Sequence, residues 1–165
     1  MEIKSTFTNE AGDVLDVVYR DIESEAYFLD KDIHSVGAYC FCGDKFVVVF
    51  NSKSNSWTPP GGGVEKDESA HGAVVRELFE ESNMKVLSHK FIGYQDIFEP
   101  PYIVSQIRSV CIVEPYGDFI SDPGGDITEI KLIDPKDYKK YFDWGIVGDR
   151  IMDRAMELKA QLLSE

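Results

Sequence analysis

The sequence GGGVEKDESAHGAVVRELFEESNM, residues 61–84, decides how the rest of the chain is interpreted. Its three glycines precede a segment that predicts a helix over about residues 68–82. Asp67 is the expected N-cap, because its carboxylate can accept hydrogen bonds from the first free amides of the helix. Asn83 is the expected residue just beyond the helix, because asparagine tolerates the left-handed backbone conformation. The segment is therefore a glycine-rich turn followed by a capped helix.

Three glutamates share one side of this helix. With about 100° between successive residues, Glu80 falls at about 300° and Glu81 at about 40° from Glu77. Ala70 and Ala73 lie on the same stripe one and two turns earlier, and we expect them to leave room above the carboxylates. Like charges at this spacing destabilise a helix, whereas hard divalent cations prefer oxygen ligands. The stripe therefore predicts a site for a divalent cation.

The alternative is a solvated acidic face without a ligand, since runs of charge usually serve solubility. The glycines favour a ligand site, because glycine backbone can approach a ligand closely and expose its carbonyl or amide groups. No Gly-Lys-Ser/Thr follows them, so the segment is not a P-loop. On the other side of the helix we expect a core-facing arc of Val74, Val75, Leu78 and Phe79.

Composition and charge limit the class of protein. The chain has 165 residues, 43% apolar and 28% charged, which is ordinary for a single soluble domain spanning 1–165. A formal charge of −13 repels phosphate backbones and anionic lipid, so nucleic-acid and membrane partners are not expected. The sequence contains no apolar run long enough for a membrane-spanning helix, and we expect no signal peptide. Cys40, Cys42 and Cys111 lack metal-type or CxxC spacing, which predicts buried, reduced thiols in a cytoplasmic protein.

Strands and helices are expected to alternate along the chain. Residues 1–32 predict one or two strands, which we take as an N-terminal, strand-rich extension. The segment WTPPGGG, residues 57–63, is expected to be irregular, because Pro59 and Pro60 lack amide donors. Further strands are expected at 35–42, 45–51, 85–98, 102–113 and 127–134, and helices at 135–142 and 147–163. This interleaving indicates an α/β or α+β fold with a mixed sheet.

The segment around the helix resembles the signature of the Nudix hydrolase family, GX5EX7REUXEEXGU, in which U is aliphatic. The matching positions are Gly62, Glu68, Arg76-Glu77-Leu78, Glu80-Glu81 and Met84. Asn83 stands where the family has glycine, a mild departure, since asparagine also adopts the left-handed conformation. The match covers 23 residues directly, and the strand order around it is also similar to the family.

The resemblance implies an α/β/α sandwich around a mixed sheet and an enzyme of the pyrophosphohydrolase type. Its substrate would be a small-molecule nucleoside diphosphate linked to another moiety X, hydrolysed with Mg²⁺ or Mn²⁺. ADP-ribose or a nucleotide sugar is the favoured substrate type, because Pro100 lies 16 residues after Met84, a spacing associated with ADP-ribose pyrophosphatases. Nucleoside triphosphates and dinucleoside polyphosphates stay open, the latter because Tyr102 resembles a marker of diadenosine-polyphosphate hydrolases.

The resemblance also implies roles for individual residues. Glu77, Glu80 and Glu81 match the metal-binding and catalytic glutamates, and the carbonyl of Gly61 is a further expected ligand. Arg76 matches the arginine that orients the glutamates. Glu68 matches a glutamate that either ligates the metal through water or braces that arginine. The general base in the family is either a glutamate of the helix or an acid on a distant loop, and Glu129 resembles a glutamate that often begins the late strand. The remaining candidates for the base are Glu99, Asp118, Asp122 and Asp126.

Substrate contacts are predicted from strand alternation. Gln106 and Arg108 share one face of a strand, so they either hold a phosphate or base or form a solvated face. Tyr102 is a further candidate for substrate binding. Apolar segments within residues 14–29 have no obvious partner, and the family often uses such additions for dimers. We therefore expect a homodimer, with a hairpin that covers its own sheet as the alternative.

Two other functional classes share this fold. One is a catalytically silent nucleotide-sensing domain, which intact glutamates disfavour. The other is a diphosphate isomerase of the isoprenoid type, which needs a catalytic cysteine such as Cys40 or Cys111.

Overall fold

A computed structural model describes all residues 1–165. Its elements are, in chain order, β1 (Glu2–Thr8), β2 (Val14–Asp21), η1 (Glu25–Tyr27), β3 (Ile33–Cys42), β4 (Lys45–Asn51), β5 (Ser56–Thr58), β6 (Gly61–Gly63), α1 (Ala70–Ser82), β7 (Met84–Glu99), β8 (Tyr102–Pro115), β9 (Ile127–Ile133), η2 (Pro135–Lys140) and α2 (Gly145–Ser164). The expected strands and helices are present in the expected order, except that residues 135–140 form a 3₁₀ helix rather than an α-helix and that the short strands β5 and β6 were not expected.

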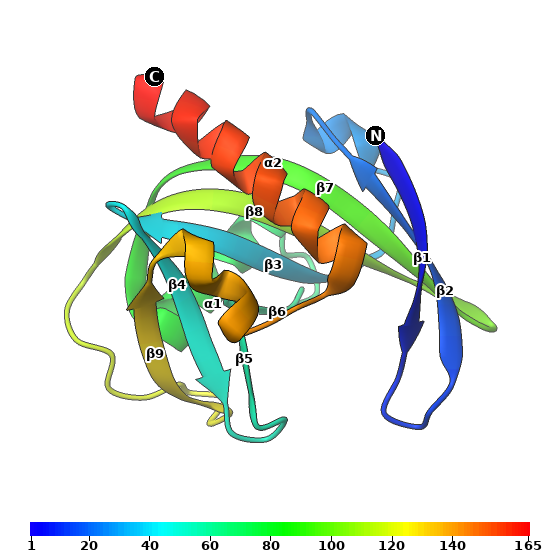
Figure 1. Ribbon diagram of the computed structural model, residues 1–165, viewed down its shortest axis with the longest axis horizontal. Helices are drawn as coiled ribbons and strands as arrows, with labels where there is room; N and C mark the ends of the chain where they lie inside the picture. Colours follow the sequence, from blue (N-terminus) through cyan, green and yellow to red (C-terminus); the bar gives the residue numbers. More distant parts are fainter.

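The strands form one mixed sheet of nine strands (Figure 1). Its main path runs β1-β2-β7-β8-β3-β4-β5, while β6 pairs with β3 and β9 pairs with β4. The β3–β8 pair is parallel, and the other pairs are antiparallel. The parallel pair places β3, which also pairs with the glycine strand β6, beside the strand that carries Gln106 and Arg108.

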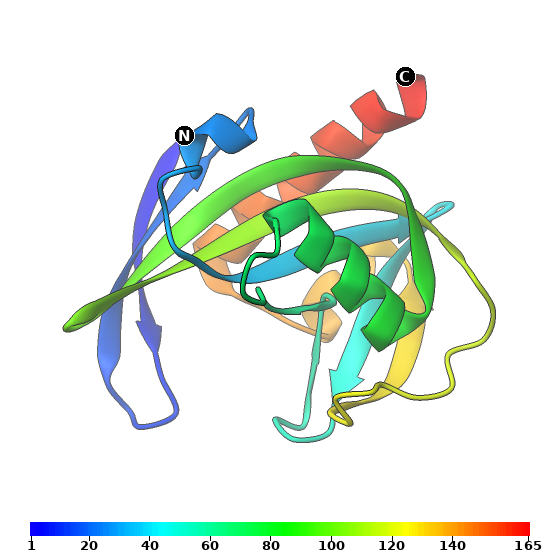
Figure 2. The ribbon, with the colours of Figure 1, turned by 180° about the vertical axis from the view of Figure 1, so that it is seen from behind.

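The two long helices cover opposite faces of the sheet, as a comparison of Figures 1 and 2 shows. Apolar side chains of α1, including Val74 and Leu78, join alternate residues of β3 and β8 in one core cluster. Those of α2, including Ile151 and Ala155, pack in a second cluster with Tyr39. Successive strand residues point to opposite faces, so the long strands supply both cores. The α/β/α sandwich around a mixed sheet is thereby confirmed.

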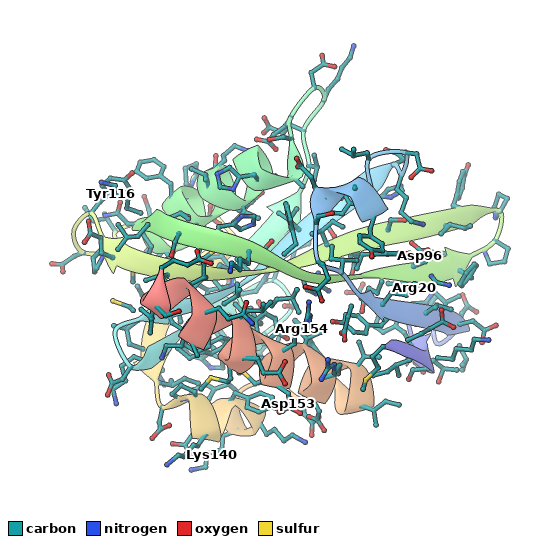
Figure 3. The ribbon with its side chains drawn as sticks, turned by 90° about the horizontal axis from the view of Figure 1, so that it is seen from above. Arg20, Asp96, Tyr116, Lys140, Asp153 and Arg154 are labelled. Carbon is teal, nitrogen blue, oxygen red and sulfur yellow. The ribbon has the colours of Figure 1, made fainter.

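The N-terminal strands are an integral part of this sheet. β2 pairs with β1 and with β7, and Tyr19 is fully buried in the core beneath α2. Phe28 packs in the core on the α1 side. Arg154, labelled in Figure 3, projects from α2 and donates to the carbonyl oxygens of Ile92 at 2.9 Å and Ile22 at 2.7 Å. The expectation that residues 14–29 lack a partner was therefore wrong, because their apolar side chains pack within their own chain; the homodimer and the description of 1–32 as an extension stay predictions.

The expectation of an irregular segment at 57–63 was also wrong. Trp57 lies in β5, opposite Phe50 of β4, and the three glycines form β6. Only Pro59 and Pro60 separate these short strands, and the carbonyl of Pro60 accepts a hydrogen bond from the amide of Ala38 at 2.8 Å. Proline lacks a donor but keeps its acceptor, so it fits at the join of two edge strands.

No helix of the structure is long and apolar enough to span a membrane.

Candidate functional site

Helix α1 begins at a serine rather than at the expected aspartate. Ser69 is the N-cap, and its side-chain oxygen accepts a hydrogen bond from the amide of Gly72 at 2.9 Å. Asp67 instead has a φ of 63° within the turn before the helix, where the amide of Glu68 donates to the carbonyl of Glu65. Asp67 was a plausible cap by residue type, but this extra turn moves the helix start by two residues.

The predicted end of the helix is confirmed. Asn83 has φ 53° and ψ 40°, which is the left-handed conformation, and its amide donates to the carbonyls of Leu78 and Phe79. Its side-chain amide also donates to the carbonyl of Asp118 at 3.0 Å. Asparagine therefore accepts the conformation that glycine usually takes and adds a tie to the loop after β8 that glycine lacks.

The faces of α1 differ in part from the helical-wheel expectation. Val74 and Leu78 are buried, but Val75 and Phe79 are 40% and 56% exposed. Phe79 lies at the margin of the sheet, with its ring 5.6 Å from that of Tyr116. Ala73 is fully buried in the core, so it does not leave open space above the glutamates. The apolar face was placed too far round the helix because periodicity does not specify which part of an apolar arc meets the sheet.

Arg76 holds the acidic side chains of the helix and the preceding turn together. Its guanidinium donates to both oxygens of Glu68, at 2.8 and 2.9 Å. It also donates to Glu77 at 2.9 Å and to Glu80 at 3.3 Å. A fourth partner is the carbonyl of Gly63, at 2.8 Å. Of the two roles expected for Glu68, the geometry shows the contact with Arg76, and the positions of Glu77 and Glu80 depend on the same guanidinium.

Glu81 lies deepest of the three glutamates, 6% exposed. One of its carboxylate oxygens accepts a hydrogen bond from the amide of Gly61 at 3.1 Å. Burial raises its pKa to about 8, and the negative charges of Glu77, Asp122 and Glu80 act in the same direction. Burial likewise raises the pKa of Glu77, against the effect of Arg76. The site therefore holds more negative charge than its own cations balance.

The glycines of β6 are needed for this arrangement. A Cβ atom at Gly61 would collide with the carbonyl oxygen of Val36 on β3. A Cβ at Gly62 would collide with the carboxylate of Glu77, whose Cδ atom would be only 2.6 Å away. Residues without side chains thus allow β6 to lie between β3 and the glutamate face of α1.

The donor set fits a hard divalent cation, although the carboxylates are not yet gathered around one point. Three carboxylates and the backbone oxygens of a glycine strand are the ligands that Mg²⁺ and Mn²⁺ prefer, and burial, aided by the neighbouring negative charges, raises the pKa of Glu81. The structure contains no group of three or more acidic, histidine or cysteine side chains already arranged to hold an ion. Arg76 holds Glu77 and Glu80, and Gly61 holds Glu81, so the side chains would have to turn toward a cation.

Among the acids expected as the general base, Asp122 is electrostatically coupled to the glutamates. Its charge contributes to the raised pKa of both Glu77 and Glu81. The amides of Gly124 and Ile127 donate to its two oxygens, at 2.9 and 3.1 Å. Glu129 is exposed on β9, opposite Phe50 of β4. The other candidates are also exposed: Glu99, Asp118 and Asp126.

Gln106 and Arg108 line a cavity of about 610 Å³ on the α2 side of the sheet. Its walls come from β1, β7, β8 and the start of α2, including Gln95, Asp143 and Trp144. These three residues were missed by sequence reasoning. The alternation that pointed to Gln106 also applies to Gln95, which lies directly opposite it on β7, whereas no sequence signal placed Asp143 and Trp144.

The cavity lies on the other face of the sheet from α1, and Gly37 is the strand residue between Arg108 and the glycine strand. Gly37 pairs with Gly61 between β3 and β6 and with Arg108 between β3 and β8. A Cβ at Gly37 would lie 3.0 Å from a terminal nitrogen of Arg108. Tyr102, the third expected substrate residue, is 71% exposed near the tip of the β7–β8 hairpin and does not line the cavity.

Comparison with known proteins agrees with this architecture. The model of the NUDIX domain family matches residues 31–154. The chain is similar to human (Homo sapiens) diphosphoinositol polyphosphate phosphohydrolase 2, with 34% identity over 76 residues, which are 42% of this chain and 41% of that protein. It is 37% identical over 62 residues to diphosphoinositol polyphosphate phosphohydrolase 3-beta from Bos taurus, covering 34% of this chain and 38% of that protein. The match spans about two fifths of the length of these relatives.

Solved structures with low sequence identity share the fold. The pyrophosphohydrolase BsRppH from Bacillus subtilis has a TM-score of 0.73 and 17% identity, covering 93% of this chain and 96% of that one. The NUDIX domain of NrtR from Shewanella oneidensis, solved with ADP ribose, has a TM-score of 0.60 and 17% identity, covering 81% and 97%. The family match extends over most of the chain and contains the glycine strand, the glutamate helix and both long strands. The chain belongs to the NUDIX domain family.

Proposed function

We propose that this protein hydrolyses the diphosphate of a nucleoside diphosphate linked to another moiety X, with Mg²⁺ or Mn²⁺ as the cofactor. The family match supports an enzyme that acts on phosphoric anhydrides. The observation that carries the proposal is the junction of β6 with α1. There, half-buried glycine backbone lies against Glu77 and Glu81, whose carboxylates have raised pKa values.

The residues of the chain have distinct tasks in this proposal. A divalent cation, when bound, supplies positive charge against the diphosphate and activates water. The three glutamates offer hard oxygen ligands, and Arg76 fixes the rotamers from which Glu77 and Glu80 approach. Gly61 and Gly62 allow a phosphate to come close to the backbone. Asp122 is our proposed general base besides Glu129, because its charge already acts on Glu77 and Glu81.

A nucleotide fits the cavity better than a highly phosphorylated inositol. Arg108 is the only arginine or lysine among the residues that line it, and Asp143 adds a negative charge. Several phosphate groups would need several cations. By contrast, an apolar wall with a few polar groups and an aromatic ring is typical of sites that hold a base or sugar. We therefore retain nucleotide sugars and ADP-ribose as favoured substrates over inositol diphosphates.

The isomerase alternative is disfavoured by the cysteines. Cys40 and Cys111 are fully buried, and burial raises the pKa of the Cys40 thiol. A buried thiol with a raised pKa is a poor nucleophile. A nucleotide-sensing domain remains a second candidate. It is favoured because Glu77 and Glu80 are engaged with Arg76 and are not gathered around a cation site. The cytoplasmic location and the homodimer stay predictions.

A hydrolysis screen tests the proposal. The purified chain is incubated with Mg²⁺ or Mn²⁺ and ADP-ribose, nucleotide sugars, dinucleoside polyphosphates, nucleoside triphosphates or an inositol diphosphate, and the products are resolved by chromatography. We expect metal-dependent release of a nucleoside monophosphate. Glu80→Gln and Glu81→Gln should each lower kcat/KM by about 10² or more while circular dichroism shows a folded protein. Binding of nucleotide without turnover of any compound would favour the sensing domain, and wild-type activity of Glu81→Gln would refute its assignment.

A further inference from the structure

Arg108 is a half-buried cation without an anionic partner. It takes part in no ion pair, although the chain carries a net charge of −13. Its Nε atom is one of only two buried side-chain nitrogen or oxygen atoms without a hydrogen-bond partner. Burial lowers the pKa of its guanidinium, and its carbon Cζ lies 5.7 Å from the centre of the Trp144 ring. An unpaired buried donor costs free energy unless a small shift of the side chain brings it to an acceptor, and Arg108 lines the cavity in which a ligand could supply one.

The neighbouring glutamines have fixed orientations. Nη2 of Arg108 donates to the side-chain oxygen of Gln106 at 2.8 Å. Because a guanidinium has no acceptor, this contact fixes which end of the Gln106 amide is oxygen. Gln95 donates from its nitrogen to the same oxygen at 2.7 Å. The oxygen of Gln106 is therefore already engaged, and its NH₂ group is left to donate beside Arg108.

An acceptor is also present in the cavity wall. Asp143 lines the cavity next to Trp144, and one of its oxygens accepts from the amide of Gly145 at 3.0 Å. Its second oxygen has no protein donor, and Asp143 forms no ion pair. The cavity thus offers donors at Arg108 and Gln106, an acceptor at Asp143 and an aromatic ring at Trp144.

This pattern distinguishes between purine bases. Guanine has two adjacent acceptors, O6 and N7, which arginine pairs with in a bidentate manner. On its other edge it has N–H donors, which suit a carboxylate. Adenine has a donor beside N7 and is matched by an amide whose oxygen and nitrogen are both free. Gln106 cannot offer such an amide, because its oxygen is engaged by Arg108 and Gln95.

We propose that this cavity binds a guanine base, with Arg108 toward O6 and N7, Asp143 toward the N–H edge and Trp144 against the ring. The proposal rests on the proposed function and selects, among its favoured substrates, a guanosine nucleotide sugar or another guanosine diphosphate linked to X over ADP-ribose. The path between the two parts of the substrate is short. Gly37 separates Arg108 from Gly61 by a single strand, and neighbouring strands are about 4.8 Å apart.

Calorimetric titration with GMP and AMP, without metal, tests the proposal apart from catalysis. GMP should bind about tenfold or more tightly than AMP, the range of one bidentate contact. Arg108→Gln and Asp143→Ala should each weaken GMP binding about tenfold and leave AMP binding nearly unchanged. Lys139→Gln is a matched control, because this lysine is partly exposed and pairs with Asp149 rather than lining the cavity. It should leave the preference intact.

Three results of the titration would overturn the proposal: AMP binding as tightly as GMP, no binding of GMP at millimolar concentration, or an equal loss of both nucleotides in Arg108→Gln. The last would assign Arg108 to the phosphate that both share. If Arg108→Gln fails to fold, Asp143→Ala still decides, because its carboxylate is in a surface loop. Hydrolysis of adenine and guanine compounds at equal kcat/KM would refute the guanine pocket and leave the pyrophosphohydrolase standing. Selective GMP binding without hydrolysis of any compound would support the guanine pocket and refute the pyrophosphohydrolase.

Discussion

The three glycines of β6 should respond differently to the same substitution by alanine. At Gly62 the new Cβ atom would lie 2.6 Å from Cδ of Glu77, whereas carbon atoms at rest are about 3.5 Å apart or more. The carboxylate must therefore move by about 0.9 Å, the difference between these distances. A misplacement of about 1 Å at a catalytic group can cost about 10² in rate. Gly62→Ala should lower kcat/KM on the best substrate by that factor.

Stability should change little in Gly62→Ala. The colliding group is a side chain that can turn, and a glycine-to-alanine change restricts the unfolded chain, which stabilises by about 0.4–1 kcal/mol. Gly61→Ala differs, because its Cβ would meet the backbone of Val36 and lie 2.9 Å from Cα of Gly37. Backbone cannot turn aside, so β6 must separate from β3. We expect Gly61→Ala to lose about 1–3 kcal/mol in the free energy of unfolding, as overpacked sites do.

Gly63→Ala is the matched control. Its Cβ would lie 3.8 Å from the carbonyl oxygen of His34, an ordinary contact. Activity and stability should stay close to those of the wild type. Hydrolysis kinetics and thermal unfolding are measured on all three variants under the same conditions, and the stabilisation by Mg²⁺ is measured as a readout independent of turnover. Equal activities of Gly62→Ala and Gly63→Ala would refute the reasoning, because only the former displaces Glu77.

Three further predictions concern the same helix and the sheet edge. Because burial raises the folded-state pKa of Glu81 to about 8, above the unfolded value of 4.5, its contribution to stability is present below pH 4.5 and is lost as the pH rises toward 8. The metal-free protein should thus lose stability over this range by thermal unfolding, Glu81→Gln should lose less, and a wild-type slope in that variant would contradict the assignment. Asn83→Gly should change the free energy of unfolding by less than about 1 kcal/mol, whereas Asn83→Val should lower both stability and Mg²⁺ binding, because β-branched residues avoid positive φ; an unchanged melting temperature in Asn83→Val would refute this. Light scattering at micromolar concentration should give a dimer mass, since β1 leaves one edge of the sheet unpaired, and a monomer mass would reject it.

The helix and its glutamates were predictable because they depend on local order. A period of 3.6 residues places Glu77, Glu80 and Glu81 on one side whatever surrounds the helix, and the left-handed end at Asn83 follows from the preference of one residue. The same reasoning failed for Val75 and Phe79, whose exposure depends on where the helix lies across the sheet. It also failed for Asp67, because two residues with capping side chains, Asp67 and Ser69, compete within one turn.

Only the tertiary structure decided what surrounds these elements. The glycines form a strand because β3 extends beyond its pairing with β4 and can pair with them there. Such pairing with a distant strand cannot be predicted from residues 57–63 alone. Strand alternation placed Gln106 and Arg108 on one face, but their cavity also needs Gln95 from β7 and Trp144 from the start of α2. Sequence by itself determined the local geometry and chemistry of the glutamate helix, since backbone periodicity acts between near neighbours. The substrate cavity arises from contacts between residues far apart in the chain, and packing of the whole sheet brings them together.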